Sequence, residues 1–411
     1  MTVRRIWTSM AAIAVMAIAG CGGSDSGGGS GGGGGGDSAS KEPIVIGQAA
    51  GFSGFMRPYD YPAFLGAQVA VKDINAKGGV LGRPLKLISS DAKSDKVQAG
   101  TSAAELLDKG AKYIIAPCDF DFGAAAAIEA QKREVVAMSD CAGTVQFGVQ
   151  GIGPFAYTMG NSGAGYAVAM AEWAHEKGWR NAYLLQDDSI EYHKQGCRAF
   201  DARWKQLEGT KVARYDHFQA DDASVASQVT RLKGLNPKAD FVFLCSVIPP
   251  ALTALRQIRS AGVDLPILAS GQTFDGDHWQ KSAPNVSDLY YPTIGLLDGK
   301  DPREDVNRIV NEVKPDAKEL LSPQVIGGYS AVQAFAAAAE KAKSVEGPEL
   351  QKALDSFKDE PLLTGPTTFT PEMHISVTRQ VAIMQVQKGD RSLLKFWTPK
   401  SVPPMDEWVS G

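Results

Sequence analysis

The sequence predicts an α/β fold made of two lobes, each built on a doubly wound parallel sheet. Three observations lead to this prediction. Short apolar runs alternate with segments that are apolar at helical spacing, which is typical of parallel sheets covered by helices. This alternating series starts a second time near the middle of the chain. The chain has 411 residues, and a globular body of that size exceeds what one hydrophobic core usually holds.

The first series covers the N-terminal part of the globular body. Apolar runs predict strands at residues 44–48, 85–90, 113–116 and 135–139. Between them, apolar residues at helical spacing predict helices at residues 63–76, 96–109 and 123–132.

The second series has a similar size. It predicts strands at residues 182–186, 211–218, 241–245 and 267–269, and helices at residues 165–177, 196–207, 224–233 and 250–261. The C-terminal part adds a strand at 289–297, helices at 302–313 and 325–342, a strand at 367–369, and a hairpin of residues 380–387 with a partner that ends at 395–397. Ligands of such sheets sit outside the carboxyl ends of the strands, so two facing lobes would enclose a cleft there.

The N-terminal 40 residues differ from the rest of the chain. Arg4 and Arg5 precede an apolar run at residues 10–19, which is too short to span a bilayer. This layout predicts a secretory signal peptide at residues 1–20. The segment Ile18-Ala19-Gly20-Cys21 resembles the bacterial lipobox, in which the cysteine is lipidated; the alternative is an ordinary signal peptide followed by a chance cysteine. Residues 21–40 are then the lipidated Cys21 and a flexible glycine and serine linker.

The composition limits the kinds of partner and the cellular compartment that we expect for this chain. The net charge is −4 and there is no long basic run, so we expect no nucleic-acid partner. No later apolar stretch reaches the length of a membrane span, so the lipid would be the only anchor. We expect a monomer in an extracytoplasmic location, tethered to the bacterial cell membrane on its periplasmic or outer face.

Four cysteines remain besides Cys21, and they allow three disulfide pairings. Cys118 and Cys141 each follow a predicted strand of the first series, whereas Cys197 and Cys245 belong to the second. We therefore predict the pairs Cys118–Cys141 and Cys197–Cys245. Metal binding is the competing interpretation, but neither a CxxC motif nor histidine-rich spacing supports it.

The sequence does not favour an enzyme. Ser53 lies near a strand end but lacks the Gly-x-Ser-x-Gly context of hydrolase nucleophiles. The five histidines form no metal-type pair, and His193 is the one expected near the cleft. No glycine-rich phosphate loop is present, so we expect neither a catalytic residue nor a cofactor nor a metal.

Several segments resemble one protein family in their order along the chain. They are Ile44-Val45-Ile46-Gly47, Phe52-Ser53-Gly54, Ile74-Asn75-Ala76-Lys77-Gly78-Gly79-Val80-Leu81-Gly82-Arg83-Pro84-Leu85 and Leu255-Arg256-Gln257-Ile258-Arg259-Ser260-Ala261-Gly262. This order resembles the leucine-type periplasmic binding proteins, the extracytoplasmic receptors of branched-chain amino acid ABC importers. The resemblance runs from residue 43 over essentially the whole remaining chain.

The resemblance implies a Venus-flytrap architecture whose chain crosses between the lobes three times, near residues 157–160, 294–297 and 365–367. The first lobe would contain residues 41–158 and 295–365, and the second residues 159–294 and 366–411. The implied function is to capture a small polar or aromatic solute, such as an amino acid or related compound, by lobe closure and deliver it to a membrane permease. A ligand-sensing lipoprotein that signals to a membrane receptor is the alternative.

The resemblance also places ligand-binding residues. Tyr59 and Tyr192 fall on the aromatic positions of the two lobes. Ala142, Gly143 and Thr144 fall on the backbone and hydroxyl donors after the fourth strand.

Other positions depart from the family. A run of serines is replaced by Cys118-Asp119-Phe120-Asp121-Phe122, and the acidic ammonium anchor by Gly271 or Gln272. We add Ser53, Arg57, Asp119, Phe120 and Gln272 as candidate ligand contacts. Arg57 favours an acid as ligand, whereas Asp119, Asp121 and Asp60 favour a hydroxylated or cationic solute, and the sequence leaves this choice open.

Overall fold

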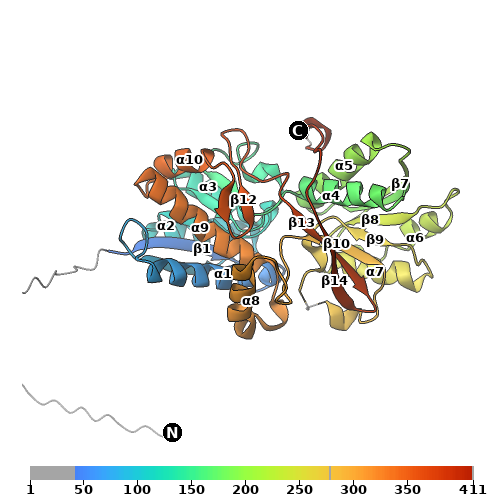
Figure 1. The fold of residues 1–411 in the computed structure, drawn as a ribbon, viewed down its shortest axis with the longest axis horizontal. Coiled ribbons are helices and arrows are strands. Elements are labelled where there is room, and N and C mark those ends of the chain that lie inside the picture. The colour runs from blue at the N-terminus through green and yellow to red at the C-terminus, as the bar shows by residue number, and fades with distance from the viewer. Residues whose placement is uncertain (1–41, 277–278, 410–411) are drawn as a thin grey trace, which may run out of the picture. The chain divides into compact units, whose positions relative to one another are not determined.

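The computed structural model describes residues 42–276 and 279–409. The signal peptide, Cys21 and the linker predicted at residues 1–40 lie outside this part. It contains a five-stranded sheet, a seven-stranded sheet and a separate two-stranded hairpin, and the two large sheets form the two lobes of Figure 1. The predicted α/β architecture of two lobes is thereby confirmed. None of the helices in this part combines the length and apolar character needed to cross a bilayer.

The strands are, in chain order, β1 (Ile44–Ala50), β2 (Leu85–Asp91), β3 (Tyr113–Ala116), β4 (Ala137–Ser139), β5 (Ala156–Thr158), β6 (Asn181–Asp187), β7 (Lys211–Phe218), β8 (Phe241–Cys245), β9 (Ile267–Ala269), β10 (Leu289–Thr293), β11 (Glu360–Leu362), β12 (Gly365–Thr367), β13 (Val381–Gln387) and β14 (Asp390–Trp397). The α-helices are α1 (Arg57–Ala76), α2 (Lys96–Asp108), α3 (Phe120–Lys132), α4 (Gly163–Glu176), α5 (Glu191–Gln206), α6 (Ala226–Lys233), α7 (Pro250–Ser260), α8 (Glu304–Ala317), α9 (Gln324–Ala342) and α10 (Gly347–Asp355).

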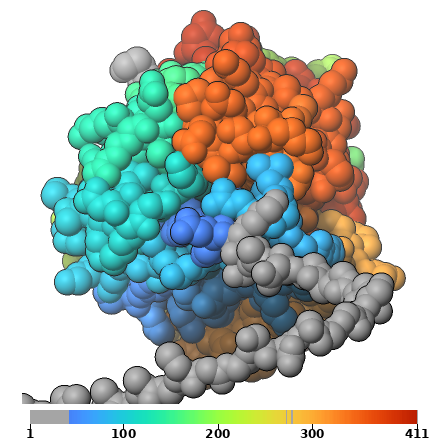
Figure 2. All heavy atoms as spheres, turned by 90° about the vertical axis from the view of Figure 1, so that its left-hand side faces the viewer, coloured from blue at the N-terminus to red at the C-terminus, as the bar shows by residue number. Residues whose placement is uncertain are grey.

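The first lobe is a parallel sheet with strand order β2-β1-β3-β4-β5 and helices on both faces. Alternate side chains of β3 point to opposite faces, as a pleated strand requires. Tyr113 packs on α9, where its hydroxyl donates to the carbonyl of Ala331. Ile114 packs instead in the alanine-rich cluster of α2 and α3. In Figure 2 the blue-green N-terminal part of this lobe and the orange segment of α9 and α10 form one continuous surface.

The second lobe has strand order β14-β13-β10-β9-β8-β6-β7. Its central strands are parallel, and β13 and β14 add an antiparallel edge. Phe243 of β8 stacks on Phe200 of α5 and Phe241 meets the aromatic rings of α5 edge to face, whereas Val242 and Leu244 pack in the cluster that contains α6 and α7. Both faces of β8 are therefore buried, which explains its uninterrupted apolar sequence.

Three segments connect the lobes, and they follow β5, β10 and β12. The third connection leaves the first lobe after the expected boundary between residues 365 and 366. β12 pairs with β11, and the rings of Phe369 and His374 pack on Tyr157 of β5, so the chain stays on the first lobe through His374. The strand predicted at residues 367–369 corresponds to β12, which starts and ends two residues earlier, and only the long-range contacts show to which lobe residues 365–374 belong.

A buried arginine ties two of these connections together. Arg379 donates hydrogen bonds to the carbonyl of Met159 (2.8 Å), to Asn161 Oδ1 (2.7 Å) and to Thr367 Oγ1 (3.0 Å). Burial lowers the pKa of Arg379 to about 10, which still leaves the group charged at neutral pH.

Three helices begin at least three residues earlier than their apolar pattern predicts. α1 starts at Arg57 rather than 63, α3 at Phe120 rather than 123, and α5 at Glu191 rather than 196. Pro58 does not prevent α1 from starting at Arg57, because proline is tolerated in the first turn of a helix. The short elements β5, α10 and β11 are absent from the prediction, and the strand predicted at 289–297 ends at Thr293.

Candidate functional site

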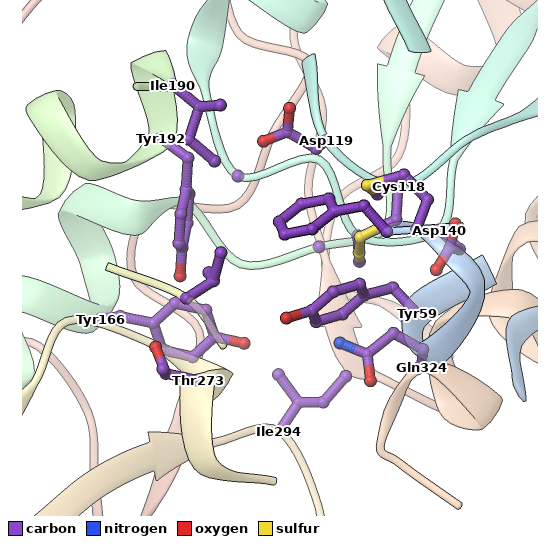
Figure 3. A pocket seen from close by; sticks show the side chains of 16 residues that line it. Tyr59, Cys118, Asp119, Asp140, Tyr166, Ile190, Tyr192, Thr273, Ile294 and Gln324 are labelled. Atoms are coloured by element: carbon purple, nitrogen blue, oxygen red, sulfur yellow. A yellow bond between two sulfur atoms is a disulfide. The ribbon is translucent and has the colours of Figure 1, made fainter. Parts of the chain in front are cut away.

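A cavity lies between the two lobes, beside the segments that connect them (Figure 3). The centres of water molecules could occupy about 60 Å³ of it, several times the ~10–15 Å³ that one water requires. Its wall consists of Phe55, Met56, Tyr59, Cys118, Asp119, Asp140, Cys141, Gly143, Gly160, Tyr166, Ile190, Tyr192, Val247, Thr273, Ile294 and Gln324. These residues stand at the carboxyl ends of strands and at the first turns of helices, as in other doubly wound sheets.

The first lobe supplies an aromatic ring and the disulfide Cys118–Cys141. Tyr59 projects from the first turn of α1, and its hydroxyl lies 3.5 Å from the carbonyl of Ile248 in the second lobe. The disulfide joins the segments that follow β3 and β4. Tyr59 and the disulfide thus form an apolar wall with one phenol group.

The second lobe supplies two further tyrosines, Tyr166 of α4 and Tyr192 of α5 (Figure 3). The ring of Tyr192 occupies a slot between glycines of both lobes: a Cβ atom added at Gly143 would meet the ring, and one added at Gly271 would meet the hydroxyl. Thr273 stands nearby and donates to the carbonyl of Ser246 (2.8 Å). The ring of Tyr192 therefore fits in this position because Gly143 and Gly271 have no side chain.

The three phenol groups are neutral, and burial shifts their ionisation further from neutral pH. Burial raises the pKa of Tyr59 and of Tyr192 above the usual value, and the carboxylate of Asp119 adds to both shifts. Burial also raises the pKa of Tyr166. All three can donate or accept hydrogen bonds but carry no charge at neutral pH.

Two carboxyl groups line the cavity. Asp119 lies at the end opposite Ile294 and Gln324 in Figure 3, and burial together with Asp121 raises its pKa to about 7. Burial and the nearby Asp60 raise the pKa of Asp140 well above the usual range. Asp140 is 1 % exposed, and its Oδ2 has no hydrogen-bond partner among the described residues.

Asp60 has a structural position instead. Its carboxylate accepts hydrogen bonds from the backbone N–H groups of Gly51 (2.6 Å) and Cys118 (2.9 Å), which follow β1 and β3. Burial raises the pKa of Asp60 to about 7. Asp60 thereby joins α1 to the ends of two strands and lies behind the cavity wall.

Hydrogen bonds between the lobes lie next to the cavity. Asp121 of α3 accepts from the backbone N–H of Glu191 (3.1 Å), the first residue of α5 in the other lobe. A helix start needs such acceptors, and the preceding Ile190 offers no capping side chain. Gln195 of α5 also donates to Gln146 of the first lobe. Asp121 thus faces a helix of the opposite lobe rather than a ligand.

The candidate ligand contacts divide into two groups. Tyr59, Asp119, Gly143 and Tyr192 line the cavity. Ser53 and Arg57 do not: Ser53 Oγ lies 3.5 Å from Asp91 Oδ2, and the guanidinium of Arg57 lies 5.7 Å from the ring of Tyr61, one helical turn further on. Arg57 is therefore not placed to hold a ligand carboxylate in this arrangement.

Three further candidates also fall outside the wall, and the fourth cannot be placed. Phe120 packs against the cluster of α2 and α3, and Thr144 is fully buried. The backbone N–H of Ala142, expected to serve a ligand, donates to Ser139 Oγ (2.9 Å). Gln272 begins a short 3-10 helix, Gln272–Phe274, and its side chain lies outside the described part.

Tyr166, Gln324 and Asp140 line the cavity but are absent from the sequence-based prediction. Tyr166 follows the small residues Gly163-Ala164-Gly165 in the first turn of α4, and Gln324 opens the alanine-rich helix α9. A polar or aromatic residue in the first turn of a helix that follows a lobe connection is the signal that would have found both. Asp140 directly follows β4, the type of position that the strand-end rule singles out.

Both predicted disulfides are present. Cys118 and Cys141 have Cα atoms 5.0 Å apart, and those of Cys197 and Cys245 are 5.8 Å apart. Cys118, Asp140 and Cys141 bring three possible metal ligands together, but the two sulfurs are bonded to each other. A disulfide sulfur is not the thiolate that binds metals.

Replacing both Cys197 and Cys245 by alanine is expected to lower the free energy of unfolding by about 4 kcal/mol. The bond closes a loop with a sequence separation of 48 residues, and its removal restores the entropy of that loop to the unfolded chain. Urea unfolding of the variant and the parent measures the difference. The double variant of Cys118 and Cys141, with a separation of 23 residues, should lose slightly less, and an unchanged stability of the first variant would contradict the role assigned to that disulfide.

Comparisons with known proteins agree with this geometry. The periplasmic binding protein family matches residues 43–391. The Leu/Ile/Val-binding protein of Escherichia coli K12 is 27% identical over 225 residues, which cover 55% of this chain and 60% of that protein. The substrate-binding protein LivJ of Streptococcus pneumoniae, solved with isoleucine, superposes with a TM-score of 0.74 at 22% identity and covers 88% of this chain and 100% of its own.

A solute-binding protein of an ABC transporter from R. palustris, solved with 4-hydroxybenzoate, also has a TM-score of 0.74, at 15% identity, over 88% of this chain and 98% of its own. The similar proteins are binding proteins, and the family is extracytoplasmic. On the match over residues 43–391, the chain belongs to the periplasmic binding protein family.

Proposed function

We propose that this protein is the extracytoplasmic solute-binding receptor of an ABC importer, and that it passes a small polar or aromatic solute to a membrane permease. The observation that carries the proposal is the cavity between the lobes, to which each lobe contributes aromatic and polar side chains. Family membership and the ABC-transporter relatives support it.

The mechanism is a shift between open and closed arrangements of the lobes. A solute that contacts both lobes binds the closed arrangement more tightly and therefore increases its population. The three connections act as the hinge, between a first lobe of residues 41–158 and 295–374 and a second lobe of residues 159–294 and 375–411. Arg379 is expected to keep two of these connections together during the movement.

The direct test is a thermal-shift screen of the purified full chain with amino acids, aromatic acids, amides and amines. A solute at 100 times its dissociation constant adds ~2.7 kcal/mol to the stability of the folded state. A solute that raises the melting temperature should also change small-angle scattering in the direction of a more compact particle. Stabilisation without compaction would contradict lobe closure.

Replacing Asp121 by alanine is expected to weaken binding of every solute by about fivefold. The closed arrangement loses the cap on α5, and a helix cap contributes typically ~1 kcal/mol. Isothermal titration of the variant measures the loss. Asp108→Ala is the matched control, because Asp108 pairs with Arg133 within the first lobe. Equal effects of the two replacements would contradict the role of Asp121 between the lobes.

We also propose that Cys21 carries a lipid that holds the protein at the membrane. The apolar run of residues 10–19 and the segment ending in Cys21 support this. Cys21→Ser should release the protein from the membrane fraction, and mass spectrometry of the parent should find acyl chains on the N-terminal peptide. Release of the parent protein into the soluble fraction would contradict the anchor.

A further inference from the structure

The wall of the cavity is acidic. Among the described residues, it contains the two carboxyl groups of Asp119 and Asp140 and no lysine, arginine or histidine. The Oδ2 atom of Asp140 is buried and has no partner in this part of the chain. An unpaired buried polar atom is costly, so the site is prepared for a ligand group that forms a hydrogen bond with Asp140.

Three cations of the surrounding elements are engaged away from the cavity. Arg57 lies over the ring of Tyr61. Lys96 lies 3.6 Å from Asp121 and over the ring of Phe122. The guanidinium of Arg379 donates to acceptors of two lobe connections. A ligand carboxylate in the cavity would therefore meet neutral hydrogen-bond donors and the carboxyl groups of Asp119 and Asp140.

The rest of the wall suits the body of an organic cation. Phe55 and Tyr59 have ring centroids 6.4 Å apart, and Tyr166 and Tyr192 approach from the other lobe. Aromatic faces attract ammonium groups through the ring quadrupole, most strongly where water is excluded. Met56, Ile190, Val247 and Ile294 add apolar surface.

We propose that the solute is an organic amine whose protonated amino group is held by Asp119 and whose aromatic or apolar body lies between Tyr59 and Tyr192. The inference rests on the proposed function and names its solute class. It departs from an α-amino acid, because no side chain of the described wall carries the positive charge that would complement a carboxylate.

Asp119 has a fixed position for this role. Its backbone has φ +84°, and its carboxylate accepts from the N–H of Asp121 (2.9 Å) at the start of α3. The titratable groups that face it are Asp121, Lys96, Tyr59 and Tyr192. Asparagine tolerates positive φ and also caps helices, so Asp119→Asn removes the charge and keeps the local structure.

The charge on Asp119 makes amine binding depend on pH. With a pKa of about 7, Asp119 takes up a proton as the pH falls below 7, whereas an ammonium ion requires the ionised form. Affinity for an amine should therefore fall with decreasing pH, toward tenfold per unit well below pH 7, and level off above it. A carboxylate ligand would show no such loss.

The test is isothermal titration of the purified full chain with matched probes. The probes are 2-phenylethylamine, 3-phenylpropanoate, which replaces the ammonium by a carboxylate, and L-phenylalanine, which carries both groups. We expect the amine to bind at least 30-fold more tightly than either carboxylate. Asp119→Asn should weaken amine binding at least tenfold and abolish its pH dependence. Asp121→Asn should change the affinities for all bound probes by a similar factor.

The outcomes separate the two proposals. Tighter binding of 3-phenylpropanoate or L-phenylalanine, or amine binding that Asp119→Asn leaves unchanged, overturns the amine inference and leaves the receptor function standing. If none of the three probes binds, the same titrations are made with the aliphatic amines and amino acids of the wider screen. Binding of amino acids alone again overturns the amine inference, whereas failure of every solute overturns both proposals.

Discussion

Gly271→Ala is expected to weaken solute binding by about 30-fold or more, while the protein remains folded. A Cβ atom at this position would overlap the hydroxyl of Tyr192 and lie 3.0 Å from its Cζ atom. The ring must then leave its slot between the lobes, and overpacking of this kind costs typically ~1–3 kcal/mol. The backbone of Gly271 does not require positive φ, so alanine fits the chain itself. Isothermal titration with the solute found in the screen measures the loss.

A second replacement identifies the cause of this loss. Tyr192→Phe removes the hydroxyl that meets the new Cβ atom and leaves only the contact of 3.0 Å with Cζ, so the double variant Gly271→Ala/Tyr192→Phe should recover most of the lost affinity relative to Tyr192→Phe alone. If the double variant stays as weak as Gly271→Ala, the clash with the hydroxyl is not the reason, and the slot assigned to Tyr192 is wrong. Melting temperatures close to that of the parent would show that the fold is intact.

Among the single replacements, Gly328→Ala is expected to have the largest effect on stability, a loss of about 3 kcal/mol in the free energy of unfolding. Helices α1 and α9 approach each other through glycine: a Cβ atom at Gly328 would lie 2.6 Å from the carbonyl carbon of Ala63 and 2.7 Å from its Cα. These are backbone atoms of a helix and cannot turn aside as a side chain would. The helices must separate, at the upper end of the usual cost of overpacking. Urea unfolding measures the change.

Gly196→Ala is the matched control for this prediction. Gly196 also lies buried in a helix, but its added Cβ would make only ordinary contacts, of which the shortest are with Ser270 Cβ at 3.6 Å and with the carbonyl oxygen of Gly163 at 3.7 Å. Alanine is the better helix former by ~0.5–1 kcal/mol, so this variant should be as stable as the parent or slightly more so. A similar loss in both variants would mean that the close approach of α1 and α9 is not the cause.

Much of the fold could be predicted from the sequence because it depends on local patterns. Strands β3, β8 and β9 have the predicted bounds, since a buried parallel strand is a continuous apolar run between polar or glycine-rich segments. The edge strand β7 also has the predicted bounds, although most of its residues are not buried. Both disulfides follow from the order of these strands, because each joins residues that belong to a single lobe. The two alternating series likewise determine that the chain forms two lobes.

The cavity could be predicted only in part. Tyr59 and Tyr192 were found through the resemblance, but both lie in helical turns that the apolar pattern does not include. A helix is recognised by the side chains that it buries in a core, whereas its first turn at a cavity carries residues that face the ligand. The apolar pattern therefore does not extend to the helix turns that carry the residues of the site.

The chain by itself determined the two α/β lobes, the disulfide pairs and the family to which the protein belongs. The tertiary structure decided that Arg57 turns away from the cavity, that Asp121 caps a helix of the other lobe, and that Asp119 and Asp140 supply the carboxyl groups of the wall. The physical reason is that these choices are made by contacts between segments far apart in sequence. Local periodicity indicates which side chains are buried in a core, but it does not indicate the direction in which a polar side chain points at the boundary between two lobes.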